Sequence, residues 1–375
     1  NLVASMLFLI GVAVLYGVTG TLNMADIAQK LPAVPASDRG LLHAGAAILA
    51  IAFLAKAGLW PLNFWLPPAY AAASAPAAAV FAILTKVGVY AVLRLWTLCF
   101  PAGAGASAGF GGDVLVWGGL VTLAYGAVGM LASQQLARLA AYSVIASSGT
   151  LVATIGFDAP VLSGGALFYL ASSTLAGCAL FLLVELLERA RQVEVGPQQV
   201  DDGNYALPAF FDAEPPPGTN LDDDEEALIG RAIPAALAFL GLTFTVCALV
   251  TAGLPPLSGF VAKLAMLTAL LGLQTPAAWT LFVLLILSGL FGAMSLMRVG
   301  MRHFWTTQDR PPPRLRVIET LPIAGLLAAS LAMVLQAEAG LAYTRAAAEA
   351  LHTPALYIDA VMGAQPVPRV TGGAP

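Results

Sequence analysis

The chain has 375 residues, of which 59% are hydrophobic and only 10% are charged. Soluble domains carry about 25% charged residues, so this composition, with a mean hydropathy of +0.84, excludes a soluble globular protein. The formal net charge of −4 is unevenly distributed, because ten acids and only three arginines fall within 189–231. The rest of the chain is slightly basic, and nothing in it supports nucleic-acid binding.

Nine stretches are apolar enough to cross a bilayer, which takes about 20 helical residues. They are 2–20, 41–66, 75–97, 114–133, 136–156, 163–187, 232–272, 276–299 and 317–336. Two of them, 41–66 and 232–272, are predicted to be interrupted, since proline removes a helical hydrogen bond. The predicted fold class is an all-α polytopic membrane protein with about nine transmembrane helices, two of them proline-broken.

The segments between these spans differ in charge. Residues 189–231 combine acids and prolines with few aliphatic residues, which predicts an exposed, flexible loop between two membrane halves. The 299–316 loop holds four arginines and directly follows a fifth, Arg298, so it is predicted to be cytoplasmic. Alternating crossings then place 134–138 and 189–231 on the same side, and the 20–40 loop and the tail outside. The alanine-rich tail after residue 340 is consistent with an amphipathic helix.

Lysine and arginine occupy different parts of the chain. Of the 17 basic residues only four are lysine, and three of these, Lys56, Lys86 and Lys263, lie inside apolar spans. Lysine near the bilayer centre costs roughly 2.5–3.5 kcal/mol on insertion scales. A buried ammonium can release its proton near neutral pH, whereas a guanidinium stays charged. The three lysines are therefore predicted to form a proton relay; the alternative is that each extends to a headgroup.

Prolines and hydroxyl residues accompany these lysines. Pro61 follows Lys56, and Pro255 and Pro256 precede Lys263. Irregular backbone at membrane depth is tolerated where it is buried in protein or faces a wet cavity, so each break is predicted to share a polar site with its lysine. The residues predicted to hold water between the lysines are Ser143, Ser147, Ser148 and Ser173, although close helix packing would also explain them.

No cofactor site is predicted. Cys99, Cys178 and Cys247 are far apart and form no C-x-x-C motif, and no glycine fingerprint for a nucleotide is present. We therefore expect neither a cofactor nor a metal, and no catalytic chemistry in this chain.

Three segments resemble a known family: "AFLAKAGLWPLNFWLPPAY" with "TKVGVY", "LARLAAYSVIASSG", and "AGLPPLSGFVAKLAML". They are similar to the antiporter-like proton-translocating membrane subunits of respiratory complex I and of multisubunit Mrp/Pha cation/proton antiporters. The opening "LYGVTGTLNMADIA" and the acidic insertion are most similar to the D-type antiporter subunits.

The resemblance implies two inverted five-helix repeats, each with a broken helix, in a bacterial inner-membrane complex. The implied organisation is 1–97 as the remainder of the first repeat, 98–188 as the start of the second, 189–231 as the acidic loop, 232–299 as the end of the second repeat, 300–316 as the basic loop, and 317–375 as the last helix and tail. Lys56 and Lys263 match the lysines of the two broken helices, and Lys86 matches the connecting residue. The glutamate that pairs with the first lysine is expected on a helix before Asn1.

One departure from the family concerns the helix before the acidic loop. Many relatives carry histidine and lysine there, whereas this chain has Ser173 and Gly177. The expected function is that of a membrane subunit of a cation/proton antiporter, with H⁺, K⁺ or Na⁺ and other antiporter subunits as partners. The alternatives are a proton-pumping subunit of complex I or a related dehydrogenase or hydrogenase, and a membrane scaffold that does not transport.

Overall fold

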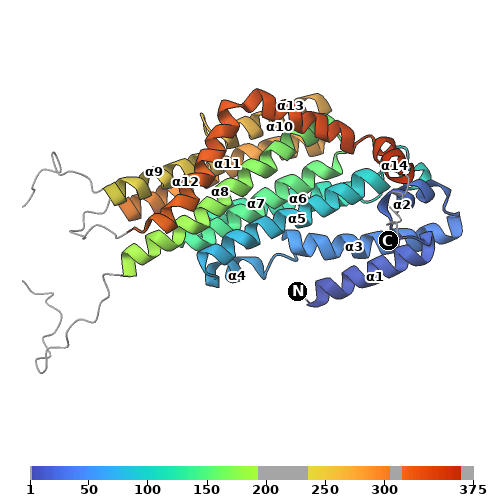
Figure 1. The fold of residues 1–375 in the computed structure, drawn as a ribbon, viewed down its shortest axis with the longest axis horizontal. Coiled ribbons are helices and arrows are strands. Elements are labelled where there is room, and N and C mark those ends of the chain that lie inside the picture. The colour runs from blue at the N-terminus through green and yellow to red at the C-terminus, as the bar shows by residue number, and fades with distance from the viewer. Residues whose placement is uncertain (1, 193–234, 305–314, 365–375) are drawn as a thin grey trace, which may run out of the picture.

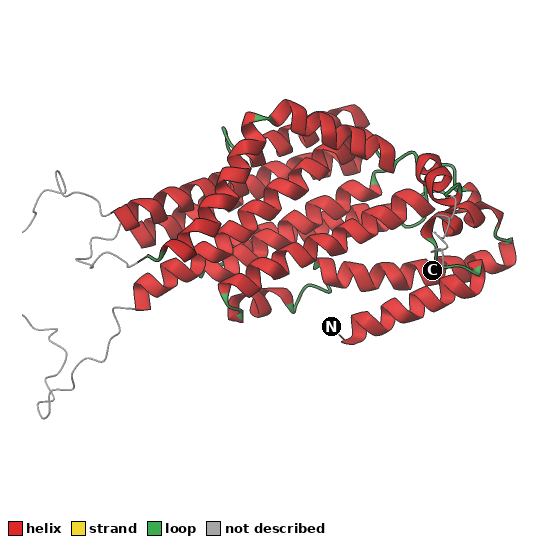
Figure 2. Cartoon of the chain, viewed as in Figure 1, coloured by secondary structure: helices red, strands yellow, loops and turns green. Residues whose placement is uncertain are grey.

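The computed structural model describes residues 2–192, 235–304 and 315–364, and every regular element within them is a helix (Figures 1 and 2). In this part of the chain, nine helices are long and apolar enough to cross a membrane. Helices suit this role because they satisfy their backbone hydrogen bonds internally. The prediction of an all-α polytopic membrane protein is confirmed.

The elements before the first gap are α1 (Leu2–Thr19), α2 (Met24–Lys30), the 3₁₀ turn η1 (Leu31–Ala33), α3 (Ala36–Ala57), α4 (Leu66–Ala72), α5 (Ala75–Cys99), the 3₁₀ turn η2 (Gly105–Ser107), α6 (Gly112–Ala132), α7 (Leu136–Gly156) and α8 (Pro160–Gln192). The remaining elements are α9 (Ala235–Ala252), α10 (Ser258–Leu273), α11 (Pro276–Phe304), α12 (Val317–Leu335), α13 (Ala337–Leu351) and α14 (Pro354–Met362).

The prediction that residues 20–40 form a loop is wrong, because most of them are helical. The Asn23 side chain accepts a hydrogen bond from the Ala25 N–H at 3.0 Å and starts α2. Lys30 at the other end of α2 donates to Asp26 at 2.9 Å, one turn away, and this bond holds the pKa of Asp26 below its usual value. Two local polar contacts thus stabilise a helix too short to show an apolar period.

Two spans extend further than predicted. Helix α8 continues to Gln192 instead of 187, and α11 continues to Phe304 instead of 299, so the first part of each predicted charged loop is helical. Arg298 lies within α11 and donates to the carbonyls of Leu131 and Ser133 at 2.7 and 2.8 Å. The long Arg298 side chain carries its charge to these carbonyls, so the residue can lie within a helix that packs against its neighbours. Residues 193–231 of the predicted acidic loop and 305–314 of the predicted basic loop lie outside the described residues.

The two broken helices stop at glycine and not at proline, which corrects the predicted cause of the breaks. Helices α3 and α9 end at Ala57 and Ala252, and each is followed by a glycine in the left-handed region, with φ of 76° at Gly58 and 77° at Gly253. Left-handed glycine is a common helix stop. The prolines follow within the non-helical segment before the next helix.

Both breaks have the same six-residue pattern, A-G-L-x-P-L, at 57–62 and 252–257. They also share their backbone bonds. Leu59 N–H donates to the Leu54 carbonyl at 3.0 Å, and Leu254 N–H donates to the Leu249 carbonyl at 2.9 Å. The two interruptions are therefore the same local structure, built twice.

Glycines bring α6 and α7 into backbone contact. A Cβ atom on Gly119 would lie 2.3 Å from the Ala153 nitrogen, and one on Gly149 would lie 2.4 Å from the Leu123 nitrogen. No side chain fits at such distances. Small residues at helix interfaces are a known means of close packing in membranes, and here they make α7 the most deeply buried span.

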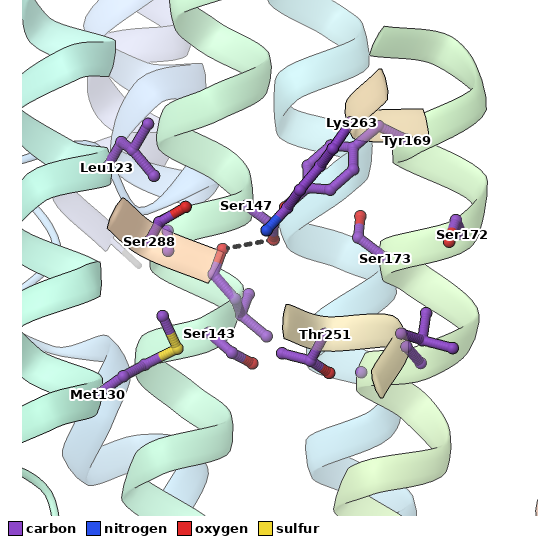
Figure 3. Close-up of a pocket in the computed structure, with 15 residues that line it drawn as sticks. Leu123, Met130, Ser143, Ser147, Tyr169, Ser172, Ser173, Thr251, Lys263 and Ser288 are labelled. Carbon is purple, nitrogen blue, oxygen red and sulfur yellow. Dashed lines mark hydrogen bonds between the residues drawn. The ribbon is translucent and has the colours of Figure 1, made fainter. Parts of the chain in front are cut away.

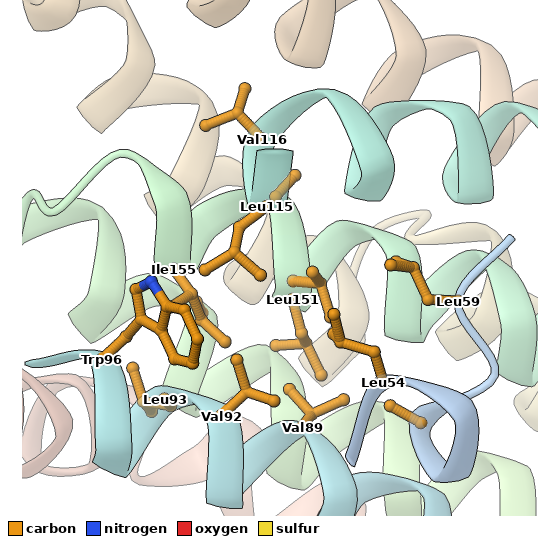
Figure 4. Packing of buried hydrophobic residues seen from close by; sticks show 14 of the residues in the cluster. Leu54, Leu59, Val89, Val92, Leu93, Trp96, Leu115, Val116, Leu151 and Ile155 are labelled. Atoms are coloured by element: carbon orange, nitrogen blue, oxygen red, sulfur yellow. The ribbon is translucent and has the colours of Figure 1, made fainter. Parts of the chain in front are cut away.

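Apolar side chains fill the space between α3, α5, α6 and α7 (Figure 4). The buried residues drawn there include Leu54, Val92, Leu115, Leu151 and Ile155. Trp96 at the edge of this cluster donates its indole N–H to the Phe110 carbonyl at 2.7 Å. This core fixes α5 and α7, which carry the polar residues described below.

The tail contains the predicted amphipathic helix, and α13 packs across α8 while α14 packs against α2 (Figure 1). His352, between them, is held by two polar contacts, one to Asp158 and one to Ser163, each at 3.0 Å. The Arg94 guanidinium lies 4.0 Å from the centre of the Tyr357 ring. The last two helices are thus attached to the bundle at its α2 end.

Candidate functional site

A small polar cavity lies inside the bundle between α7, α8, α9, α10 and α11 (Figure 3). Its volume is about 30 Å³, and because a water needs roughly 10–15 Å³, it has room for one or two molecules. Its polar lining residues are Ser143, Ser147, Tyr169, Ser172, Ser173, Thr251, Lys263 and Ser288. Hydroxyl groups and one ammonium face it, and none of the described lining residues has a carboxylate.

Lys263 enters this cavity from α10 and is 7% exposed. Its Nζ donates to the carbonyl of Ala252 at 2.8 Å. Ala252 is the last residue of α9, so this carbonyl has no partner within its own helix. The C-terminal end of a helix also carries partial negative charge. The break between α9 and α10 therefore supplies an acceptor and a favourable field for the ammonium.

Lys86 approaches the same cavity from α5 and is 4% exposed. Its Nζ donates to the hydroxyls of Ser147 and Ser148 on α7. Ser147 in turn donates to the Val144 carbonyl at 2.9 Å and lines the cavity. The Lys86 ammonium is thus one hydroxyl group away from the space that Lys263 faces.

Lys56 lies in the last turn of α3, immediately before the first break, and is half-buried. Lys56 is not among the described residues that line the cavity between Lys86 and Lys263. Helix α5 passes close to this turn, because a Cβ on Gly88 would lie 3.0 Å from the Ala57 nitrogen. The structure therefore brings together two of the three predicted lysines and places Lys56 at the helix end beside α5.

The predicted serines all lie at this site. Ser143, Ser147 and Ser173 line the cavity, and Ser148 accepts from Lys86 at 3.4 Å. Pro61, Pro255 and Pro256 are exposed and are not among the described residues that line it. In the first break, the Trp60 N–H, next to Pro61, donates a hydrogen bond to the Thr122 hydroxyl of α6 at 2.9 Å.

Four further lining residues, Tyr169, Ser172, Thr251 and Ser288, were not among the predicted site residues. The repeated A-G-L-x-P-L pattern would have identified Thr251, which stands two residues before its left-handed glycine, as Lys56 does in the first break. Tyr169 has no such signal, since an aromatic residue in an apolar span is usually a packing residue. A metal centre has no support in the described residues, which contain no group of three or more candidate ligands.

Comparison with known proteins identifies the family. The family described as "NADH:quinone oxidoreductase/Mrp antiporter, TM" matches residues 1–201. The chain belongs to this family. The family resemblance inferred from the sequence motifs is confirmed.

Two curated relatives, both D-type antiporter subunits, match nearly the whole chain. The one from Rhizobium meliloti (strain 1021), named as belonging to a probable K⁺/H⁺ antiporter, is 48% identical over 97% of this chain and 67% of its own length. The one from Bacillus subtilis (strain 168), named as belonging to a Na⁺/H⁺ antiporter, is 33% identical over 96% of this chain and 66% of its own length. The chain therefore spans about two thirds of these family members.

Solved structures share the fold. A chain in the Mrp complex from Dietzia sp. DQ12-45-1b has a TM-score of 0.73 at 24% identity and covers 97% of this chain and 68% of its own length. A chain of respiratory complex I from Thermus thermophilus with bound NADH has a TM-score of 0.67 at 21% identity and covers 94% of this chain and 67% of its own length. The antiporter-like membrane fold is thus confirmed, at identities that show the fold alone.

Proposed function

We propose that this chain is a membrane subunit of a multisubunit monovalent cation/proton antiporter, in which buried lysines carry protons across a hydrated path near the membrane midplane. The names of the two curated relatives support the antiporter, and K⁺ or Na⁺ with H⁺ as the exchanged ions. The partners would be the other antiporter subunits, and the location the cytoplasmic membrane of a bacterium.

The observation that carries the proposal is the cavity shared by Lys263 and Ser147, the hydroxyl acceptor of Lys86. A proton that leaves one ammonium can reach the other amine through water and hydroxyl groups that both donate and accept. The rest of the cavity wall is apolar, so the water lies in a low-dielectric interior where each additional unneutralised charge is costly. Release from one lysine therefore favours uptake by the next.

Gly177 supports a path through water at this point. It lines the cavity together with Ser173, and a Cβ at Gly177 would meet nothing within 4 Å. These are the two positions where the family resemblance implies histidine and lysine. In this chain, we propose, one or two waters and the Ser147 hydroxyl take the place of those side chains.

We further propose that the two breaks are equivalent parts of two repeats, with 1–97 as the remainder of the first and 98–299 as the second. The shared A-G-L-x-P-L pattern and the matching backbone bonds support this. Lys56 then belongs to the first repeat and Lys263 to the second, with Lys86 and its serines between them.

The test is antiport by the complete complex in everted membrane vesicles, measured with a pH-sensitive dye after addition of K⁺ or Na⁺. Lys86→Met and Lys263→Met should each reduce antiport at least tenfold while the complex still assembles. Lys30→Met is the matched control, because Lys30 lies at the surface and is not among the described residues that line the cavity. Normal antiport in both buried variants would remove the lysines from the mechanism.

The second candidate function is a proton-pumping subunit of a redox complex, which the fold shared with complex I allows. The same vesicles separate the two. An antiporter responds to a cation gradient without a redox substrate, whereas a redox-driven pump would require NADH or another electron donor and would not respond to the cation.

A further inference from the structure

A second and larger cavity opens at the end of the bundle where α8 finishes. Its volume is about 260 Å³, enough for on the order of ten waters. We call it the vestibule. Its lining is mostly apolar and includes Tyr70, Ser74, Ala75, Ala137, Glu185 and Glu188. Because Ser74 and Glu188 are exposed, the vestibule reaches the surface.

The wall on the α8 side carries two carboxylates one turn apart. Glu185 is half-buried, and its carboxylate accepts a hydrogen bond from the Ala75 N–H at the start of α5 at 3.2 Å. Glu188, nearer to the mouth, is exposed. The other described lining side chains carry no charge, so the Glu188 carboxylate gives the mouth a negative charge that attracts cations, including hydronium.

The inner end of the vestibule is closed by Tyr70, which is 2% exposed. The Tyr70 hydroxyl is hydrogen-bonded to the Thr85 hydroxyl at 2.8 Å. Thr85 directly precedes Lys86 in α5. The Tyr70 hydroxyl therefore lies between the vestibule and the buried Lys86 ammonium.

We propose that the vestibule is the proton-uptake mouth for Lys86, and that Tyr70 is a positioning residue that separates the vestibule from the relay. This rests on the proposed function, since it assumes that Lys86 is protonated and deprotonated in turn. The vestibule lies beside the start of α7, at the end of the bundle that the arginine distribution predicts to be cytoplasmic.

The proton balance is simple. A water molecule in the vestibule gives a proton inward, which becomes the third N–H of the Lys86 ammonium, and bulk solvent reprotonates the water. This transfer leaves the charges of Glu185 and Glu188 unchanged. Lys86 passes its proton on through Ser147, and no other group gains or loses charge.

The first experiment probes the vestibule with charged thiol reagents in vesicles that contain the complete complex. In Ser74→Cys, a methanethiosulfonate reagent with a quaternary ammonium should slow antiport at least fivefold. Ser74 makes no side-chain hydrogen bond to its helix end, so the substitution is mild. The matched control is Gln135→Cys, exposed at the same end and outside the vestibule. The native Cys99, Cys178 and Cys247 are buried, and the unmodified chain controls for other subunits.

The second experiment changes the charge and the inner wall without a reagent. Glu188→Gln should lower antiport severalfold at alkaline pH, where protons are scarce, and leave it nearly normal at acidic pH. Tyr70→Phe keeps the ring and removes the hydroxyl, and should change the pH profile without loss of assembly. Glu338→Gln, an exposed carboxylate on α13, should do neither.

The outcomes separate this proposal from the proposed function. Antiport that survives Lys86→Met contradicts the relay itself. If Lys86→Met abolishes antiport but modified Ser74→Cys, Glu188→Gln and Tyr70→Phe all keep the normal rate and pH profile, the relay stands and the vestibule is not its uptake route.

Discussion

Gly289 allows a direct test of how Lys263 is held. It lies on α11 opposite the end of α9, and a Cβ added to it would lie 2.7 Å from the Ala252 carbonyl oxygen and 3.3 Å from the Lys263 Nζ. The same carbonyl accepts the hydrogen bond of Lys263. Gly289→Ala therefore places a methyl group against both partners of this bond and should separate them.

The expected loss can be worked out from its parts. Overpacking costs about 1–3 kcal/mol, and loss of a hydrogen bond from a charged donor costs about 1.5–3 kcal/mol. Replacing glycine by alanine within a helix returns about 0.5–1 kcal/mol. The net destabilisation should be about 1.5–5.5 kcal/mol.

Gly292 on the same helix is the matched control. A Cβ there would lie 3.8 Å from the Met130 Cε, an ordinary contact, so Gly292→Ala should be neutral or slightly stabilising. The assay is thermal unfolding of the purified complex together with antiport in vesicles. Gly289→Ala should melt lower, on the order of 5 °C, and lose most antiport. Equal melting and equal antiport for the two variants would refute the hydrogen-bonded seat of Lys263.

Two further predictions concern other parts of the molecule. Gly177→Leu should fill the cavity between the lysines and reduce antiport at least tenfold with normal assembly. Gly272→Leu, where an added Cβ also meets nothing within 4 Å, should not; equal antiport in the two variants would mean that the cavity is not used. His352→Ala should remove two hydrogen bonds from the tail, cost about 1–3 kcal/mol, and speed amide exchange in 337–362; unchanged exchange would show that His352 does not hold these helices.

The spans were predictable because the bilayer imposes one simple rule, a run of about 20 apolar residues. That rule fails where other forces form the helix. Seven-residue α2 is supported by an Asn23 cap and by the Lys30–Asp26 pair. Near its C-terminal end, α11 is joined to the α6–α7 turn by the hydrogen bonds of Arg298. Hydropathy does not register such polar contacts.

The candidate site was predictable in part, from the rarity of lysine within apolar spans. That signal selected Lys56, Lys86 and Lys263. The last two face one cavity, directly or through one serine, and Lys56 is not among its described lining residues. The same signal could not select Tyr169 or Ser288, whose residue types are ordinary in membrane helices and whose place at the cavity depends on the packing of α8 and α11. The breaks were predicted from the positions of proline, although the helices already stop at Gly58 and Gly253.

Because α3 and α9 end at glycines, each break leaves a helix C-terminus that can bind a cation. A helix that ends inside the membrane leaves its last carbonyls without partners and its negative end in a low-dielectric region. An ammonium relieves both costs, as Lys263 does at the carbonyl of Ala252. Lys56 stands in the last turn of α3, at the equivalent end of the other broken helix. In the proposed relay, the break would hold the Lys263 ammonium at a carbonyl with no carboxylate among the described cavity-lining residues. A fixed carboxylate partner would oppose the release of its proton.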